Sequence, residues 1–285
     1  MKTSNKLIIA FAVLMFVVPL TIMAYTINKN YKDPEEIKKQ EDANLHFNTP
    51  SVGFNSIALQ KTFKSISVTG KTQSTKTWGI NLVTDKDYGV KVPETFKDLI
   101  EVSVDVNGQL HITFKGEIKD VWSPIVIYVY ASRIEELNVS SLNEMVLRFK
   151  DKTEALQLNV KDVNTLDLRE EFNVNNLSVD AEKVNGLDLG GEGVRSLSLN
   201  LRSSNFNSDR KSYDSLNISA SEGSGLNIIG DHQNKDSIAI NQLTLNTSGE
   251  VDVNIANIKL NAVSGSLSDE TMIKMPISYL KKMIK

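Results

Sequence analysis

The sequence predicts an all-β protein, a β-solenoid (β-helix) of two-strand coils of about 20 residues, preceded by one N-terminal transmembrane helix. Three observations predict this class: an apolar–x–x–Leu–x–aliphatic pattern recurring about every ten residues, a polar residue between nearly every pair of aliphatics, and one uncharged N-terminal segment. Alternating apolar and polar positions are typical of half-buried strands. The central positions of the repeat are Leu166, Leu177, Leu187, Leu197, Phe206, Leu216 and Leu226.

The ten-residue step determines the expected coil. A strand of about five residues spans roughly 16 Å, and the other residues must turn a corner. About ten residues cannot close a full turn, but about 20 provide two strands and two corners. We therefore expect alternate copies to stack as parallel strands, so that Leu166 pairs with Leu187 and Leu177 with Leu197.

Two other folds compete with the solenoid. A leucine-rich repeat shares the string L-x-x-L-x-L, but its period is about 20–29 residues and includes a segment on the convex side. The step of about ten residues in this chain leaves no room for that segment. An antiparallel meander or sandwich would favour many Asn-Gly or Asp-Gly turns. The sequence has only two such pairs, Asn107-Gly108 and Asn185-Gly186, which argues against this fold. Antiparallel pairing of Leu166 with Leu177 would exclude the solenoid.

The N-terminal region predicts a membrane segment. Residues 1–6 form a short cytoplasmic n-region, residues 7–27 a transmembrane signal anchor, and residues 28–50 a juxtamembrane spacer or disordered tether. The uncharged segment would span about 31 Å as a helix, enough to cross a bilayer. A cleavable signal peptide ending near Ala24 is the alternative. Either way, the C-terminal domain is expected in the periplasm or outside, or at the cell surface after cleavage.

Residues 51–271 are predicted to form the solenoid domain. Glu101–Val106 and Gln109–Phe114 flank Asn107-Gly108, which predicts a hairpin with a type I′ turn. Residues 230–237 interrupt the repeat and should protrude as a loop. Residues 272–285 are predicted to cap the last coil, since an uncapped end would invite strand pairing.

Composition narrows the possible functions. The chain has no cysteine, which excludes disulfides, thiol catalysis and cysteine-ligated metals. A formal net charge of −3 argues against nucleic acid as a partner. The three histidines, His46, His111 and His232, have no metal-ligand spacing, and no G-x-S-x-G nucleophile motif is present. We predict no cofactor, no metal and no catalytic residues.

The outward residues of the repeat are the candidate binding residues. Asp167 and Asp188 should lie on adjacent coils of one face, followed by Asn207 and Asn227. Two carboxylates about 5 Å apart could bind Ca²⁺ or share a proton, but a solvated face is the favoured interpretation, because the next residues of the row are neither acids nor bases nor aromatics. The opposite face offers Ser178, Ser198 and Asn217.

Several segments resemble the auto-transporter adhesin head GIN domain family of bacterial envelope proteins. The carrying residues are Phe63–Gly70, Gly89–Val92, Leu99–Phe114, Pro124–Tyr130 and Ile134–Ser140. The resemblance covers residues 60–265 and departs from the family pattern at Lys71–Trp78. It implies a β-helical fold and an envelope address, but no defined activity.

The sequence therefore predicts a membrane-anchored envelope protein that presents its solenoid for adhesion, binding or scaffolding without catalysis. The partners would be the membrane, through residues 7–27, and an envelope protein or glycan. A β-helical polysaccharide lyase or hydrolase is the first alternative, because such enzymes place acids and bases along one face of the coils. An envelope signalling or stress-sensing protein is the second.

Overall fold

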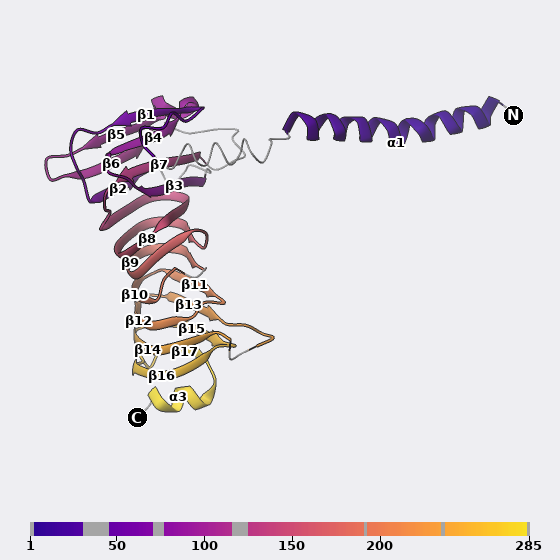
Figure 1. The fold of residues 1–285 in the computed structure, drawn as a ribbon. Helices are drawn as coiled ribbons and strands as arrows, with labels where there is room; N and C mark the ends of the chain where they lie inside the picture. Colours follow the sequence, from indigo (N-terminus) through magenta and orange to yellow (C-terminus); the bar gives the residue numbers. More distant parts are fainter. Residues whose placement is uncertain are drawn as a thin grey trace. The chain divides into compact units, whose positions relative to one another are not determined.

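The computed structural model describes residues 3–30, 46–70, 77–115, 125–190, 193–234 and 237–283. The chain divides into two compact units, Met1–Asn44 and Leu45–Lys285. Residues 31–45, most of the predicted spacer, lie outside the described residues. The two units are shown in Figure 1.

The first unit contains helix α1 (Thr3–Asn30). Pro19 lies inside the helix, and the Thr21 hydroxyl donates to the carbonyls of Val17 and Val18 at 2.9 Å. The prediction of a helix here is thus confirmed. In the described part of the chain, however, none of the helices has both the length and the apolar character required to cross a membrane. The predicted transmembrane signal anchor at residues 7–27 is therefore not supported.

The second unit is all-β, as predicted, and its described strands join in one hydrogen-bonded sheet. Its N-terminal part mixes the two kinds of pairing. Strand β1 pairs antiparallel with β4, β4 with β7, and β5 with β6, whereas β2 and β3 pair in parallel with β8. The elements here are β1 (Phe54–Ala58), β2 (Ser65–Thr69), β3 (Thr77–Thr84), β4 (Gly89–Pro93), the 3₁₀ helix η1 (Glu94–Leu99), β5 (Ile100–Val104), β6 (Gln109–Phe114) and β7 (Ile125–Ala131).

The predicted hairpin is present, but its turn differs from the prediction. Strands β5 and β6 pair antiparallel, with Val104 opposite Leu110. A type I′ turn needs two residues with positive φ, and here only Gly108 has one, at 77°. The Asp105 carboxylate accepts hydrogen bonds from the backbone N–H groups of Asn107 and Gln109, each at 2.9 Å. This side chain closes a longer loop and replaces the two-residue turn.

The C-terminal part is a stack of parallel coils. Leu166 pairs with Leu187, and Leu177 with Leu197, both in parallel register. The two pairings that the solenoid prediction requires are therefore present, and the antiparallel meander is wrong for this region. The elements here are β8 (Glu136–Leu168), β9 (Phe172–Leu189), β10 (Ser196–Arg202), β11 (Asn205–Asp209), β12 (Tyr213–Ser221), β13 (Ser224–Ile229), β14 (Ala239–Ser248), β15 (Val251–Ala256), β16 (Lys259–Ser266) and β17 (Thr271–Lys274).

The coils form two parallel ladders, which define two faces. Face A comprises residues 155–161 of β8 and 176–182 of β9, followed by β10, β12, β14 and β16. Face B comprises residues 165–168 and 186–189, followed by β11, β13, β15 and β17. Each coil thus contributes one strand to each face, as the ten-residue step predicts.

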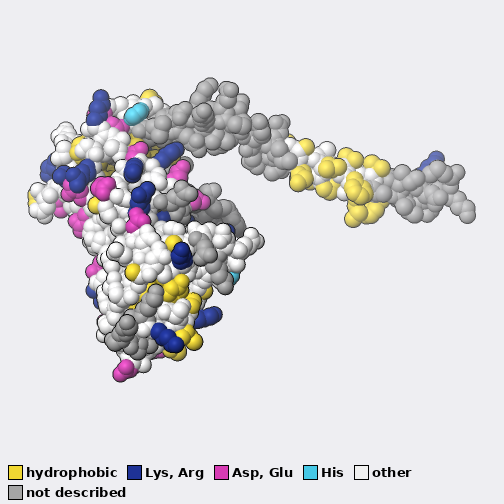
Figure 2. Space-filling view, turned by 60° about the horizontal axis from the view of Figure 1, so that its bottom comes forward, with side chains coloured by type: hydrophobic (Ala, Val, Ile, Leu, Met, Phe, Trp, Pro, Cys, Tyr) yellow, Lys and Arg dark blue, Asp and Glu magenta, His cyan; other side chains and the backbone are white. Residues whose placement is uncertain are grey.

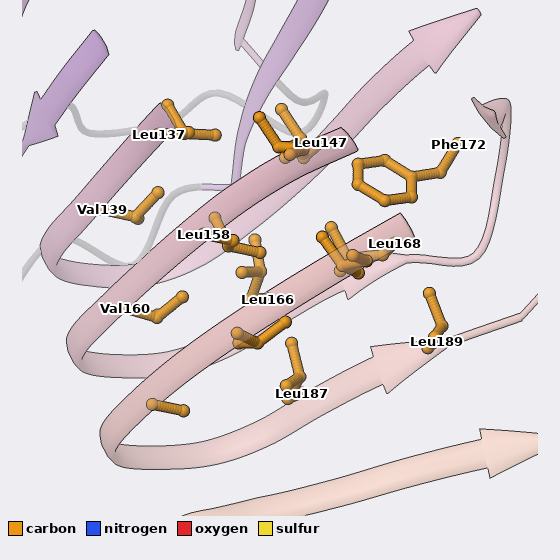
Figure 3. Packing of buried hydrophobic residues seen from close by; sticks show 14 of the residues in the cluster. Leu137, Val139, Leu147, Leu158, Val160, Leu166, Leu168, Phe172, Leu187 and Leu189 are labelled. Atoms are coloured by element: carbon orange, nitrogen blue, oxygen red, sulfur yellow. The ribbon is translucent and has the colours of Figure 1, made fainter. Parts of the chain in front are cut away.

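The apolar residues of both faces point into a shared core. Leu166 is fully buried and Leu187 is 1% exposed. Figure 3 shows these side chains stacked between the two strands of each coil, with Leu158 and Val160 opposite them. Burying one such side chain contributes roughly 1.5–3 kcal/mol, and no single coil hides its apolar face without its neighbours. Stacking therefore stabilises the fold.

At one corner of successive coils, one residue adopts the left-handed backbone conformation. These residues have φ between 48° and 57°, a conformation that costs a non-glycine residue roughly 1–2 kcal/mol. Buried serines support the same corner: the Ser204 hydroxyl accepts from the Val184 N–H at 3.0 Å, and the Ser204 N–H donates to Ser224 Oγ at 3.2 Å. Stacked neighbours thus hold the strained corner in place. The left-handed residues are Ser141, Asp162, Lys183, Ser203 and Glu222.

A long insertion and a short helix complete the unit. The step along face A is 20 residues from Leu177 to Leu197 but 27 from Leu216 to Leu243, so the connection between β13 and β14 contains the extra residues. This agrees with the loop predicted at 230–237, of which residues 235–236 lie outside the description. Helix α3 (Ile277–Met283) contacts β16. The predicted cap residues thus divide between β17 and α3.

Candidate functional site

The outward side chains of face A form two polar rows. The register places Gln157, Ser178, Ser198 and Asn217 in the first row, and Asn159, Asp180, Asn200 and Ser219 in the second row. Neighbouring members are about 4.8 Å apart, the spacing of paired strands. On the side of the second unit that Figure 2 shows, acidic and basic side chains are scattered among uncharged groups.

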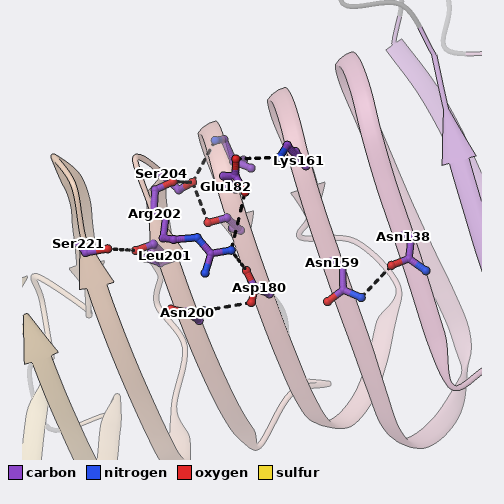
Figure 4. Close-up of polar contacts among 12 residues, drawn as sticks. Asn138, Asn159, Lys161, Asp180, Glu182, Asn200, Leu201, Arg202, Ser204 and Ser221 are labelled. Atoms are coloured by element: carbon purple, nitrogen blue, oxygen red, sulfur yellow. Dashed lines mark hydrogen bonds and ion pairs between the residues drawn. The ribbon is translucent and has the colours of Figure 1, made fainter.

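The second row uses its polar groups to link the coils. The Asn159 amide donates to Asn138 Oδ1 at 2.8 Å, and the Asn200 amide donates to Asp180 at 3.0 Å. The Arg202 guanidinium lies 2.9 Å from the same carboxylate, as Figure 4 shows. Half-exposed ion pairs of this kind contribute at most about 1 kcal/mol each. The second row therefore links adjacent coils by hydrogen bonds and has few polar groups left for a ligand.

The first row lines a depression in the surface, which we call the face A groove. It has a volume of about 450 Å³, and its lining includes Gln157, Ser178, Ser198 and Asn217. Within the described part of the chain, the hydroxyls of Ser178 and Ser198 have no hydrogen-bond partner, whereas the Asn217 amide makes only a long contact of 3.4 Å to Ser215. The structure therefore brings the three predicted residues Ser178, Ser198 and Asn217 together in a groove with available hydroxyls.

Asp167 lies on face B, and Arg169 neutralises it. The guanidinium donates to the carboxylate from Nε at 3.0 Å and from Nη2 at 2.7 Å, and the Arg169 N–H donates to it at 2.9 Å. Burial opposes ionisation of Asp167, but these hydrogen bonds hold its pKa below the ordinary value. Asp167 therefore remains an anion with its oxygens occupied.

Asp188 is directly beside Asp167 on the next coil, as the sequence predicts. The row continues through Asn207 and Asn227, also as predicted. Asp188 accepts a hydrogen bond from the Asn207 amide at 2.8 Å. In the chain segments described here, the His, Asp and Glu side chains form no group of three that could hold a metal ion.

The three histidines lie apart from one another, and each contacts a different polar group. His111 Nε2 is 3.2 Å from Asp105 Oδ2 in the first hairpin, and His232 Nδ1 is 2.8 Å from the Asn257 amide. His46 Nδ1 is 3.6 Å from the buried Asp85 carboxylate. The described histidines thus share no site.

A second depression on face B was not predicted, and we call it the face B groove. It has a volume of about 600 Å³, and Asn207, Gly225, Asn227, Asp252 and Lys274 contribute to its lining. Sequence reasoning placed Asn207 and Asn227 in the row but stopped there. The 27-residue step from Asn227 hides the fact that Asn254 continues the row. The available signal was the similarity of V-D-V-N-I (residues 251–255) to L-N-I-I (residues 226–229), in which an asparagine follows an aliphatic residue of the core.

No family model matches the sequence, and no curated protein matches it. Several solved structures are similar. A candidate adhesin from Bacteroides fragilis is 14% identical, with a TM-score of 0.44, and the match covers 79% of this chain and 94% of that chain. A candidate adhesin from Parabacteroides merdae is 13% identical, with a TM-score of 0.33 and coverage of 78% and 91%. A candidate lipid-binding protein from Parabacteroides distasonis is 13% identical, with a TM-score of 0.29 and coverage of 78% and 94%.

The names given to the similar proteins are those of binding proteins and not of enzymes. None of the matches confirms the head GIN family or an auto-transporter. Overlap of this degree carries no argument about function, which must come from the chain itself.

Proposed function

We propose that this protein is a non-catalytic binding module of the bacterial cell envelope, a β-solenoid that binds an envelope protein or glycan through the face A groove. One observation carries the proposal: Ser178 and Ser198 present unpaired hydroxyls at the coil spacing in a groove of about 450 Å³. In the second row, by contrast, the side chains of Asn159, Asp180 and Asn200 are hydrogen-bonded between coils. The groove thus has free hydrogen-bonding groups on face A.

The carbohydrate enzyme alternative is disfavoured by the state of Asp167. A glycoside hydrolase needs one carboxylic acid with a raised pKa to protonate the leaving group, beside a second carboxylate. Burial does act to raise the pKa of Asp167, but the hydrogen bonds from Arg169 lower it overall. Asp188 is its neighbour and is bonded to Asn207. Release of reducing or unsaturated ends from a polysaccharide by the purified protein would overturn the non-catalytic proposal.

The envelope location is part of the same proposal and is supported by the sequence. Lys2 and Lys6 precede a long uncharged segment, the pattern of an exported chain. Protease added to intact spheroplasts should then digest the second unit, while a cytoplasmic marker stays intact. Full protection of the second unit until the cells are lysed would refute an external location.

The binding proposal is tested by filling the face A groove. In the double variant Ser178→Gln/Ser198→Gln, longer polar side chains occupy the groove on outward strand positions. Full-length protein carrying both changes should bind to isolated envelope fragments of the producing bacterium at least about tenfold more weakly than wild type. The matched control is Ser219→Gln/Ala262→Gln, which changes two exposed face A positions outside the groove.

The control should bind like the wild type, and all three proteins should melt at similar temperatures. Wild-type affinity in the groove double variant would contradict the proposal. Treating the fragments separately with protease and with periodate then identifies the ligand class. Loss after protease indicates a protein, whereas loss after periodate indicates a glycan.

A further inference from the structure

The polar row of face B contains a break in its ladder of amide hydrogen bonds. The Asn207 amide donates to Asp188 at 2.8 Å on one side, and the Asn254 amide donates to Asn227 Oδ1 at 2.8 Å on the other. Asn207 and Asn227 are register partners, yet no hydrogen bond joins their side chains. Among the residues that the structure describes, Asn207 Oδ1, an acceptor, and Asn227 Nδ2, a donor, thus have no partner on these adjacent coils.

The break lies beside a notch created by Gly225. In the neighbouring row Asn205 pairs with Gly225 and Gly225 with Asp252, so one side chain is missing between two polar residues. Gly225 lies inside β13 without a positive φ, so the backbone conformation does not require glycine. A glycine inside a strand costs roughly 0.5–1 kcal/mol and commonly marks close approach by a ligand or another backbone.

A Cβ at position 225 would lie 2.5 Å from Asn205 Oδ1, the far end of a flexible side chain. The packing therefore does not forbid a larger residue, and Asn205 could move aside. The notch and the break line the same face B groove of about 600 Å³. This volume lies within the range of about 300–1,000 Å³ that is typical of small-ligand sites.

The free groups of the groove indicate the chemistry of its ligand. A hydroxyl can donate to Asn207 Oδ1 and accept from Asn227 Nδ2 at once, whereas a carboxylate only accepts and an ammonium only donates. The exposed Asp252 and Lys274 add one charge of each sign, so the groove favours neither anions nor cations. A neutral ligand with several hydroxyls satisfies all of these groups.

We propose that the face B groove binds a neutral saccharide, one hydroxyl of which completes the ladder between Asn207 and Asn227. The site is separate from the face A groove and does not depend on it. It uses Gly225 for access, and it uses Asp252 and Lys274 as further hydrogen-bonding groups at the rim. An ordered water in the same position is the competing occupant, and the experiment distinguishes the two.

The test uses full-length protein and three neutral hexasaccharides, built from glucose, mannose or N-acetylglucosamine, in calorimetric titrations. At least one should bind. Gly225→Thr fills the notch and Asn227→Leu removes the donor, and each should weaken that binding at least about tenfold. The matched controls are Ala262→Thr and Gln242→Leu, which make the same kinds of change at exposed face A positions. Both should remain within about twofold of the wild type.

Absence of binding by all three saccharides, or wild-type affinity in both groove variants, would overturn the proposal and leave water as the occupant. If Gly225→Thr lowers the melting temperature, the exposed Asn227→Leu variant decides alone. The double variant Ser178→Gln/Ser198→Gln separates the two grooves. It should keep its saccharide affinity, and loss of affinity there but not in the face B variants would overturn this inference while leaving the face A proposal intact.

Discussion

Leu187 is the most informative position for testing the stack of coils. It pairs with Leu166 on one side and Phe206 on the other, and it is 1% exposed. Leu187→Ala removes about three carbons, which corresponds to roughly 2.4 kcal/mol at about 0.8 kcal/mol each. A residual cavity raises the expected cost to about 3–4 kcal/mol. Urea unfolding followed by circular dichroism measures this loss.

Hydrogen exchange shows which strands lose stability in the Leu187→Ala variant. In a stack of coils each strand depends on the strands directly above and below it, so amides of residues 165–168 and of β11 should lose protection before those of β16. Val106→Ala is the control, because Val106 is 92% exposed and its change should stay within about 0.5 kcal/mol. A cost below about 1 kcal/mol for Leu187→Ala, or an even loss of protection over the whole unit, would refute the reasoning.

Three further predictions concern single residues of the second unit. The buried Lys91 ammonium donates to the carbonyls of His46 and Thr49 and to the Ser51 hydroxyl at 2.8–2.9 Å, so Lys91→Met should cost about 2 kcal/mol and speed hydrogen exchange at residues 46–51. Burial opposes ionisation of Asp85, yet backbone N–H donors hold its pKa below the ordinary 3.8. Its carboxylate thus stabilises the fold above about pH 4, and this stability is lost as the pH falls through the lowered pKa. The stability difference between wild type and Asp85→Asn should therefore shrink in acid urea titrations. The exposed Lys183 has a φ of 55°, so Lys183→Gly should raise the free energy of unfolding by about 0.5–1 kcal/mol and Lys183→Val should lower it, which thermal melts can rank.

The coil spacing was readable from the sequence because it depends on burial alone. Leucines recurring about every ten residues specify which side chains enter the core, and the pairing of Leu177 with Leu197 follows from chain length. The corners were not readable. Asp162 and Lys183 adopt the left-handed conformation, although neither residue type predicts a positive φ as a glycine would. Stacking against neighbouring coils imposes this conformation, and that is a tertiary effect.

The hairpin turn shows a similar limit on a smaller scale. Asn107-Gly108 predicted two residues with positive φ, but the Asp105 carboxylate binds two backbone N–H groups and stabilises a longer loop. A side chain that precedes the dipeptide thus overrides the preference of the dipeptide itself. Local propensity identified the strands correctly and the turn incorrectly, because the turn was decided by one additional hydrogen-bonding group.

The candidate sites depend on a distinction that sequence patterns do not contain. Asp167 and Ser178 both occupy outward positions of the repeat, and the pattern treats them alike. Asp167 is held by the Arg169 side chain two residues later, whereas Ser178 has the uncharged Gln157 and Ser198 beside it in its row. The aspartate therefore has no free oxygen for a ligand, while the serine hydroxyl remains available. Binding capacity on a repeat surface is thus determined by which polar groups the neighbouring side chains leave unpaired, and those groups are known only once the coils are in register.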